Sequence, residues 1–204
     1  MSTNTRFTLF LLLIISAVHA QDVEHSNSVG VYYGFGNDIK NKDYSYNSHY
    51  FKLQFCTVLK ESKKMKYELL VQPQVDFVEH QLLNLYYIKE DVANYQEKRL
   101  EYGRLKNIKN YSLNFGLVAS RSLSERFSVF MLASIGPMVT DTETERLSKG
   151  FAFSTVLSLG FSFKIHTSIF EFRPNFGHLS NAGLQQLNNG FNSVNLELGL
   201  NVPL

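Results

Sequence analysis

The stretch that decides the fold reads "FAFSTVLSLGFSF" and runs from Phe151 to Phe163. Large apolar side chains occupy every second position except Thr155, and mostly Ala, Ser or Gly lies between them. A period of two indicates a β-strand with one apolar face and one small or polar face. Strands in soluble sheets usually have about 5–6 residues, whereas a tilted strand needs about 9–11 to cross a membrane. The stretch therefore predicts a membrane-crossing strand.

The same alternation recurs along the chain. It predicts eight strands, at 28–37, 48–60, 65–79, 109–121, 126–139, 150–164, 167–178 and 190–202. Short and long connections alternate, with the long ones at 38–47, 80–108, 140–149 and 179–189. Transmembrane barrels combine short periplasmic turns with longer extracellular loops in this way. We expect an all-β fold, an eight-stranded antiparallel transmembrane β-barrel of the outer membrane.

The N-terminus has the features of a secretory signal peptide. Arg6 precedes an apolar run from Phe7 to Ile15, and small residues follow up to Ala20. This run is too short to span a bilayer as a helix. We expect residues 1–20 to be a cleaved signal peptide and residues 21–204 to form a single barrel domain. We expect the exported protein to reside in the outer membrane of a Gram-negative bacterium.

The composition limits the functions and fold classes that the chain can have. The 20 basic and 18 acidic residues give a net charge of +2, which does not favour nucleic-acid binding. Cys56 is the single cysteine, so no disulfide is expected within the chain. The sequence implies no metal and no cofactor. One alternative remains open, a soluble sandwich or lipocalin-like barrel whose apolar faces point inward.

The last two predicted strands can be aligned in one register. In "TSIFEFRPNFGH", residues 167–178, the even positions are mostly apolar and should face lipid, as should His178. Antiparallel pairing of His178 with Asn192 puts Arg173 opposite Glu197 in the lumen, so opposite charges meet. We therefore expect His178 and Asn192 to share the lipid face at the extracellular end.

A serine follows at a spacing suited to catalysis. Ser180 is two residues after His178, so an extended chain puts both side chains on one face. An imidazole beside a hydroxyl can activate a serine nucleophile, and Asn192 can orient the ring, as in Cys-His-Asn proteases. The amides of residues 181–183 can hold an oxyanion. The alternative for the same residues is a structured polar loop.

The motif resembles the PagL-type lipid A 3-O-deacylases. Their signature reads His-x-Ser-Asn-Ala-Gly-Leu, followed by Asn-x-Gly-x-Glu. The matching residues here are His178, Ser180, Asn181, Ala182, Gly183, Leu184, Asn188 and Gly190. The resemblance implies a metal-free hydrolase that removes an ester-linked acyl chain from lipid A of lipopolysaccharide. Its active site would lie on the lipid-facing exterior near the extracellular end.

The resemblance also implies roles. Ser180 would be the nucleophile and His178 the base, and the amides of Asn181, Ala182 and Gly183 would form the oxyanion hole. Asn192 stands where the family has glutamate, so it could orient the imidazole but not neutralise an imidazolium. Two other functions remain open: a non-catalytic barrel that binds lipid or a partner through its loops, and an esterase for another membrane lipid. The sequence does not specify an oligomeric state.

Overall fold

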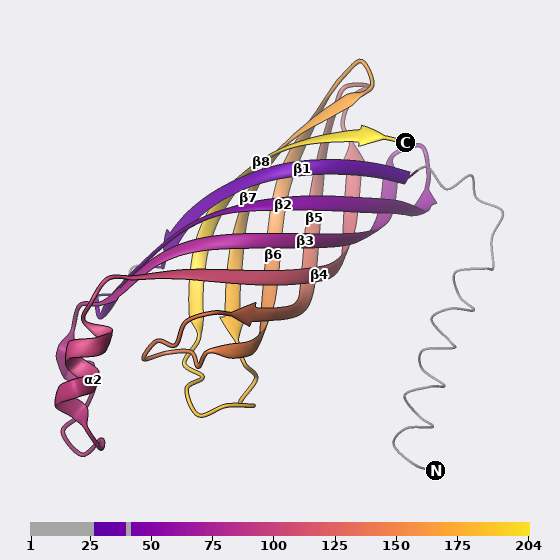
Figure 1. Ribbon diagram of the computed structural model, residues 1–204. Helices are drawn as coiled ribbons and strands as arrows, with labels where there is room; N and C mark the ends of the chain where they lie inside the picture. Colours follow the sequence, from indigo (N-terminus) through magenta and orange to yellow (C-terminus); the bar gives the residue numbers. More distant parts are fainter. Residues whose placement is uncertain (1–26, 40–41) are drawn as a thin grey trace, which may run out of the picture.

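The computed structural model describes residues 27–39 and 42–204 (Figure 1), so the expected signal peptide lies outside the described residues. Within this part the chain forms a closed antiparallel barrel in which each strand pairs with its neighbours in sequence and β1 pairs with β8. The strands are β1 Asn27–Asp38, β2 Tyr44–Glu61, β3 Met65–Leu82, β4 Lys106–Ser122, β5 Phe127–Thr140, β6 Gly150–Ile165, β7 Ser168–Ser180 and β8 Phe191–Pro203. The expected eight-stranded antiparallel barrel is confirmed.

The connections alternate as predicted, although several strands are longer than expected. β2 begins at Tyr44 instead of residue 48, and β7 continues to Ser180 instead of ending at residue 178. The long connection between β3 and β4 contains the 3₁₀ turn η1 Leu85–Tyr87 and the helix α2 Tyr95–Tyr102. This helix was not predicted from the sequence, because α2 buries only Tyr102 and so has no apolar stripe. No helix in the described part of the chain is long and apolar enough to span a membrane.

The apolar faces of the strands point outward. Along β7, Phe170, Phe172 and Phe176 are exposed, while Arg173 between them is buried. Leu157, Leu159 and Phe161 are likewise exposed on β6. A soluble barrel would bury these side chains, so that alternative is wrong for this chain.

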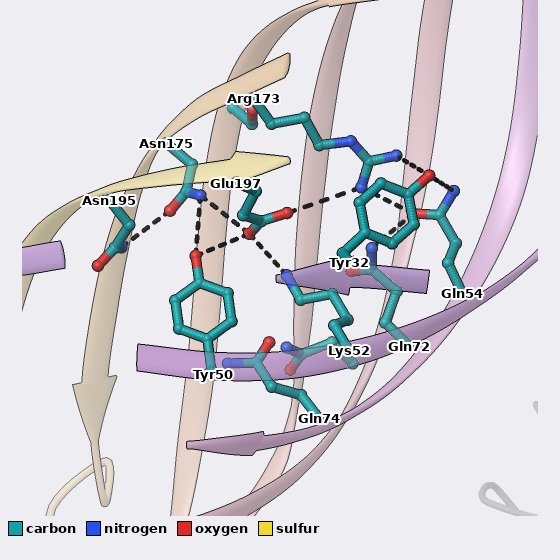
Figure 2. Close-up of polar contacts among 12 residues, drawn as sticks. Tyr32, Tyr50, Lys52, Gln54, Gln72, Gln74, Arg173, Asn175, Asn195 and Glu197 are labelled. Atoms are coloured by element: carbon teal, nitrogen blue, oxygen red, sulfur yellow. Dashed lines mark hydrogen bonds and ion pairs between the residues drawn. The ribbon is translucent and has the colours of Figure 1, made fainter. Parts of the chain in front are cut away.

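The interior of the barrel is filled by a polar network (Figure 2). Arg173 pairs with Glu197 in the register, as predicted, and its Nη1 lies 3.8 Å from Glu197 Oε2. The shorter contacts are with other residues: Lys52 Nζ lies 2.8 Å from Glu197 Oε1, and the Arg173 guanidinium hydrogen-bonds Glu171. These buried groups therefore provide one another with hydrogen-bond partners and counter-charges inside the barrel.

An apolar cluster closes the barrel at the end that carries the longer loops. It consists of Tyr44, Tyr46, Val78, Ile108, Met138, Leu147, Ala152 and Phe191. Leu147 comes from the β5–β6 loop, and Phe191 is the first residue of β8. The cluster therefore anchors the residue directly before Asn192.

Candidate active site

The β7–β8 hairpin brings His178 and Asn192 together on the outer face of the barrel. They are antiparallel partners, and His178 Nδ1 lies 2.7 Å from Asn192 Oδ1. The predicted register is therefore confirmed. On its other side, His178 pairs with Thr155 of β6, which carries a hydroxyl on an otherwise apolar strand face.

This hydrogen bond determines what the imidazole can do. A side-chain amide oxygen only accepts hydrogen bonds, so Nδ1 of a neutral His178 must carry the hydrogen that is donated to Asn192. Nε2 then keeps a free lone pair and can take up a proton. The geometry thus provides an oriented general base.

Ser180 is the last residue of β7 and lies half-buried beside this base. Ser180 follows His178 by two positions along an extended strand, so the two side chains project from the same face. Among the described residues, the one side-chain hydrogen bond of His178 is that to Asn192, so none joins it to Ser180 in this structure. Hydrogen bonds between a base and its nucleophile often tighten only when substrate binds.

A compact turn follows Ser180. Asn181 is fully buried, and its side chain accepts from Gly183 N at 3.0 Å and donates to Leu187 O at 2.8 Å. Its own amide donates to Asn188 Oδ1 at 2.7 Å. Ala182 and Gly183 take positive φ values of 53° and 77°. Asn181 and Asn188 thus hold the backbone after Ser180 in one conformation.

This turn changes the expected set of oxyanion donors. Three main-chain N–H groups were predicted as donors, but those of Asn181 and Gly183 already donate to side-chain oxygens. An N–H donates one good hydrogen bond, so these two are not available to an oxyanion. Among the described residues, no hydrogen bond is donated by the main-chain N–H of Ala182. That amide is the donor left for a ligand beside Ser180.

Gly190 closes the loop against the histidine. Its φ is +63°, a conformation that favours glycine. A Cβ at this position would lie 2.4 Å from Leu179 O and 3.5 Å from His178 Cε1. Only a residue without a side chain fits between the returning chain and the end of β7.

The β5–β6 loop also supports the site, which the sequence analysis did not anticipate. Leu147 forms a β-bridge with Asn188, and Ser148 N donates to Leu187 O at 3.2 Å. In Figure 1 these two loops lie together at one end of the barrel. Residues so far apart in sequence leave no local pattern that would reveal the contact. No group of three or more His, Cys, Asp or Glu residues in the described ranges could hold a metal ion.

Comparison with known proteins agrees with this architecture. A family model described as lipid A 3-O-deacylase (PagL) matches residues 64–201. The crystal structure of the outer membrane enzyme PagL is 15% identical, covers 86% of this chain and 99% of its own, and superposes with a TM-score of 0.60. At this identity the structural match shows the fold alone.

Other small barrels are more distant. Ail, the attachment invasion locus protein of Yersinia pestis, is 14% identical, with 89% of this chain and 100% of its own covered at a TM-score of 0.44. Neisserial surface protein A is 9% identical. The match covers 88% of this chain and 97% of that protein, with a TM-score of 0.47. No curated protein sequence matches the chain.

Proposed function

The chain belongs to the PagL lipid A 3-O-deacylase family, and from this membership we propose that it hydrolyses an ester-linked acyl chain of lipid A in the outer membrane. The observation that carries the proposal is the 2.7 Å hydrogen bond between His178 and Asn192 on the outer face of the barrel, beside Ser180. The substrate is itself a membrane lipid, so a site on this face meets it without an entry channel.

Ser180 is the proposed nucleophile and His178 the proposed base. Ser180 Oγ attacks the ester carbonyl carbon while His178 Nε2 takes the hydroxyl proton. The bond from the acyl carbon to the sugar oxygen then breaks, and Nε2 returns the proton to that oxygen. Water, deprotonated by Nε2, then attacks the acyl-serine carbonyl. The bond from the acyl carbon to Ser180 Oγ breaks, and Nε2 returns the proton to Oγ, which releases the fatty acid and restores Ser180.

Asn192 takes the orienting role that glutamate has in the family signature. Replacing the acid of a serine-protease triad with Asn lowers the rate about 10⁴-fold through the wrong histidine tautomer. Here Oδ1 of Asn192 accepts from Nδ1, which is the tautomer that the base needs. What Asn192 lacks is the negative charge that would stabilise the imidazolium.

The tetrahedral intermediate needs a donor for its oxyanion, and we assign the amide of Ala182. It follows Ser180 by two residues in a turn that the Asn181 and Asn188 side chains hold in place. A preorganised donor of this kind is worth about 10²–10³ in rate.

The outer face beside the site suits an acyl chain. Phe176 lies two residues before His178 on the same face of β7, toward the middle of the barrel. It pairs with Leu157 of β6 and with Val194 of β8. All three are exposed. An acyl chain that lies along this strip places its ester near Ser180.

The test is incubation of the purified protein with lipopolysaccharide, and separately with phosphatidylethanolamine vesicles, followed by mass spectrometry of both lipids. We expect lipid A to lose the mass of one acyl chain and the phospholipid to remain intact. Cleavage of the phospholipid alone would make the protein an esterase for another membrane lipid. No cleavage of either would favour a non-catalytic barrel.

A further inference from the structure

Arg146, in the β5–β6 loop, hydrogen-bonds the backbone of the loop that leads into β8. Its Nε donates to Gly190 O at 2.6 Å and its Nη2 donates to Asn189 O at 3.0 Å. The backbone contact is reciprocal, because Gly190 N donates to Arg146 O at 3.1 Å. One guanidinium thus holds two successive carbonyls directly before Phe191 and Asn192.

The guanidinium is itself held between aromatic rings. Its carbon lies 4.7 Å from the ring centre of Tyr44 and 5.9 Å from that of Phe191. Nη1 lies 3.5 Å from the hydroxyl of Tyr87, which also accepts from Asn189 Nδ2 at 2.6 Å. Arg146 is therefore a fixed point, because rings and carbonyls restrain it on several sides.

The segment that Arg146 binds, residues 189 and 190, lies next to the proposed base His178. A Cβ added at Gly190 would lie 2.4 Å from Leu179 O and 3.5 Å from His178 Cε1, and Asn192 follows two residues later. If the carbonyls of residues 189 and 190 lost the guanidinium, the turn would rearrange to bond with water. Asn192 Oδ1 would then move relative to Nδ1 of His178, and errors of about 1 Å at a catalytic group can cost 10²-fold in rate.

We propose that Arg146 is a positioning residue that holds Asn192 in place to orient His178. The inference rests on the proposed function, since it explains how the proposed base is kept in its active tautomer. A different role, in which Arg146 binds a phosphate of the substrate, is less favoured by the contacts. Three of the five N–H groups of its guanidinium already donate to protein oxygens.

The test compares Arg146→Ala with Arg99→Ala. Arg99 is a matched control because it also bonds a backbone carbonyl, Ile88 O at 2.8 Å, and lies over two tyrosine rings, but it does not touch the site. We expect Arg146→Ala to lower kcat on lipid A about 10- to 100-fold with KM within about threefold. Arg99→Ala should stay within twofold in both parameters.

Two further measurements separate positioning from general loosening of the fold. Millimolar guanidinium should restore part of the activity of Arg146→Ala, because it can occupy the vacated space between the rings. The kcat of Arg146→Lys should lie between those of the wild type and Arg146→Ala, since an ammonium group lacks the planar fork of donors that binds both carbonyls. A rise in KM with kcat unchanged would overturn the proposal in favour of phosphate binding. An equal loss in Arg99→Ala would overturn it in favour of a general structural effect.

The histidine tautomer gives a readout that does not depend on turnover. Nitrogen NMR of ¹⁵N-histidine-labelled protein in detergent, assigned with His178→Gln, reports which ring nitrogen carries the hydrogen. We expect one Nδ1–H form in the wild type and a mixture in Arg146→Ala. An unchanged signal in Arg146→Ala would contradict the inference even if lipid A is the substrate. A changed signal would support it even if the protein acts on another lipid.

Discussion

His178 of β7 and Asn192 of β8 are antiparallel partners joined by a 2.7 Å hydrogen bond on the outer face of the barrel. The register that pairs them also pairs Arg173 with Glu197 inside the barrel. A shift of one residue would turn every side chain of β7 to the other face. The buried charges and the proposed site therefore depend on the same alignment of the hairpin.

Removing the acceptor at position 192 should impair the proposed base. Asn192→Leu keeps a similar volume but leaves Nδ1–H without its partner, so we expect kcat to fall by about 10²-fold or more. Asn192→Glu should raise kcat about tenfold, because hydrogen bonds to a charged group are about 1–1.5 kcal/mol stronger. Lipid A turnover measures both. Equal rates in all three proteins would show that position 192 does not orient the base.

Two glycines in the same loop should differ in their tolerance of a methyl group. Gly190→Ala places a Cβ 2.4 Å from Leu179 O, whereas Gly183→Ala meets nothing within 4 Å. Both have positive φ, so each variant carries a backbone strain of about 1–2 kcal/mol. We expect kcat to fall about 10²-fold in Gly190→Ala and only a few-fold in Gly183→Ala. The opposite order would contradict the close packing of residue 190 against His178.

The buried charges should govern stability. Glu197→Gln leaves Lys52 without its counter-charge and leaves Arg173 with Glu171 alone, and we expect the free energy of unfolding in detergent to fall by about 3 kcal/mol. Glu101→Gln is the control, because Glu101 is 61% exposed in its pair with Lys106 and exposed pairs contribute only about 0–1 kcal/mol. Urea titration measures both. Equal losses would show that the lumen network contributes no more than a surface pair.

Glu197→Gln should also separate stability from activity. The network lies inside the barrel, whereas His178, Ser180 and Asn192 lie on its outer face. Below the unfolding transition we expect the specific activity on lipid A to stay within about twofold of wild type. A large loss in a fully folded sample would mean that the lumen network also positions the site.

The strands and the β7–β8 register were predictable because their information is local and periodic. Alternation assigns each residue to a face, and one opposite-charge pair, Arg173 with Glu197, selects the alignment. The proximity of His178 to Asn192 then follows without further knowledge. The strand ends were less predictable, because β7 continues as a strand through Ser180 although two of its last three residues, His178 and Ser180, are polar.

The remaining features depend on contacts that sequence patterns do not encode. Arg146 meets Gly190 across 44 positions, and nothing near either residue indicates the contact. The loss of two of the three expected oxyanion amides depends on which way the Asn181 and Asn188 side chains turn. Side-chain direction in an irregular loop is set by its tertiary partners, so three-dimensional geometry was required.

The central claim is that Ser180 attacks an acyl ester of lipid A. The most direct measurement compares lipid A mass spectra after incubation with the wild type, Ser180→Ala and the control Ser134→Ala, whose buried hydroxyl has no hydrogen-bond partner among the residues that the structure describes. Each protein is first shown to be folded by its heat-dependent mobility on gels. We predict that the wild type and Ser134→Ala remove one acyl chain and that Ser180→Ala removes none. Full activity in folded Ser180→Ala would contradict the account.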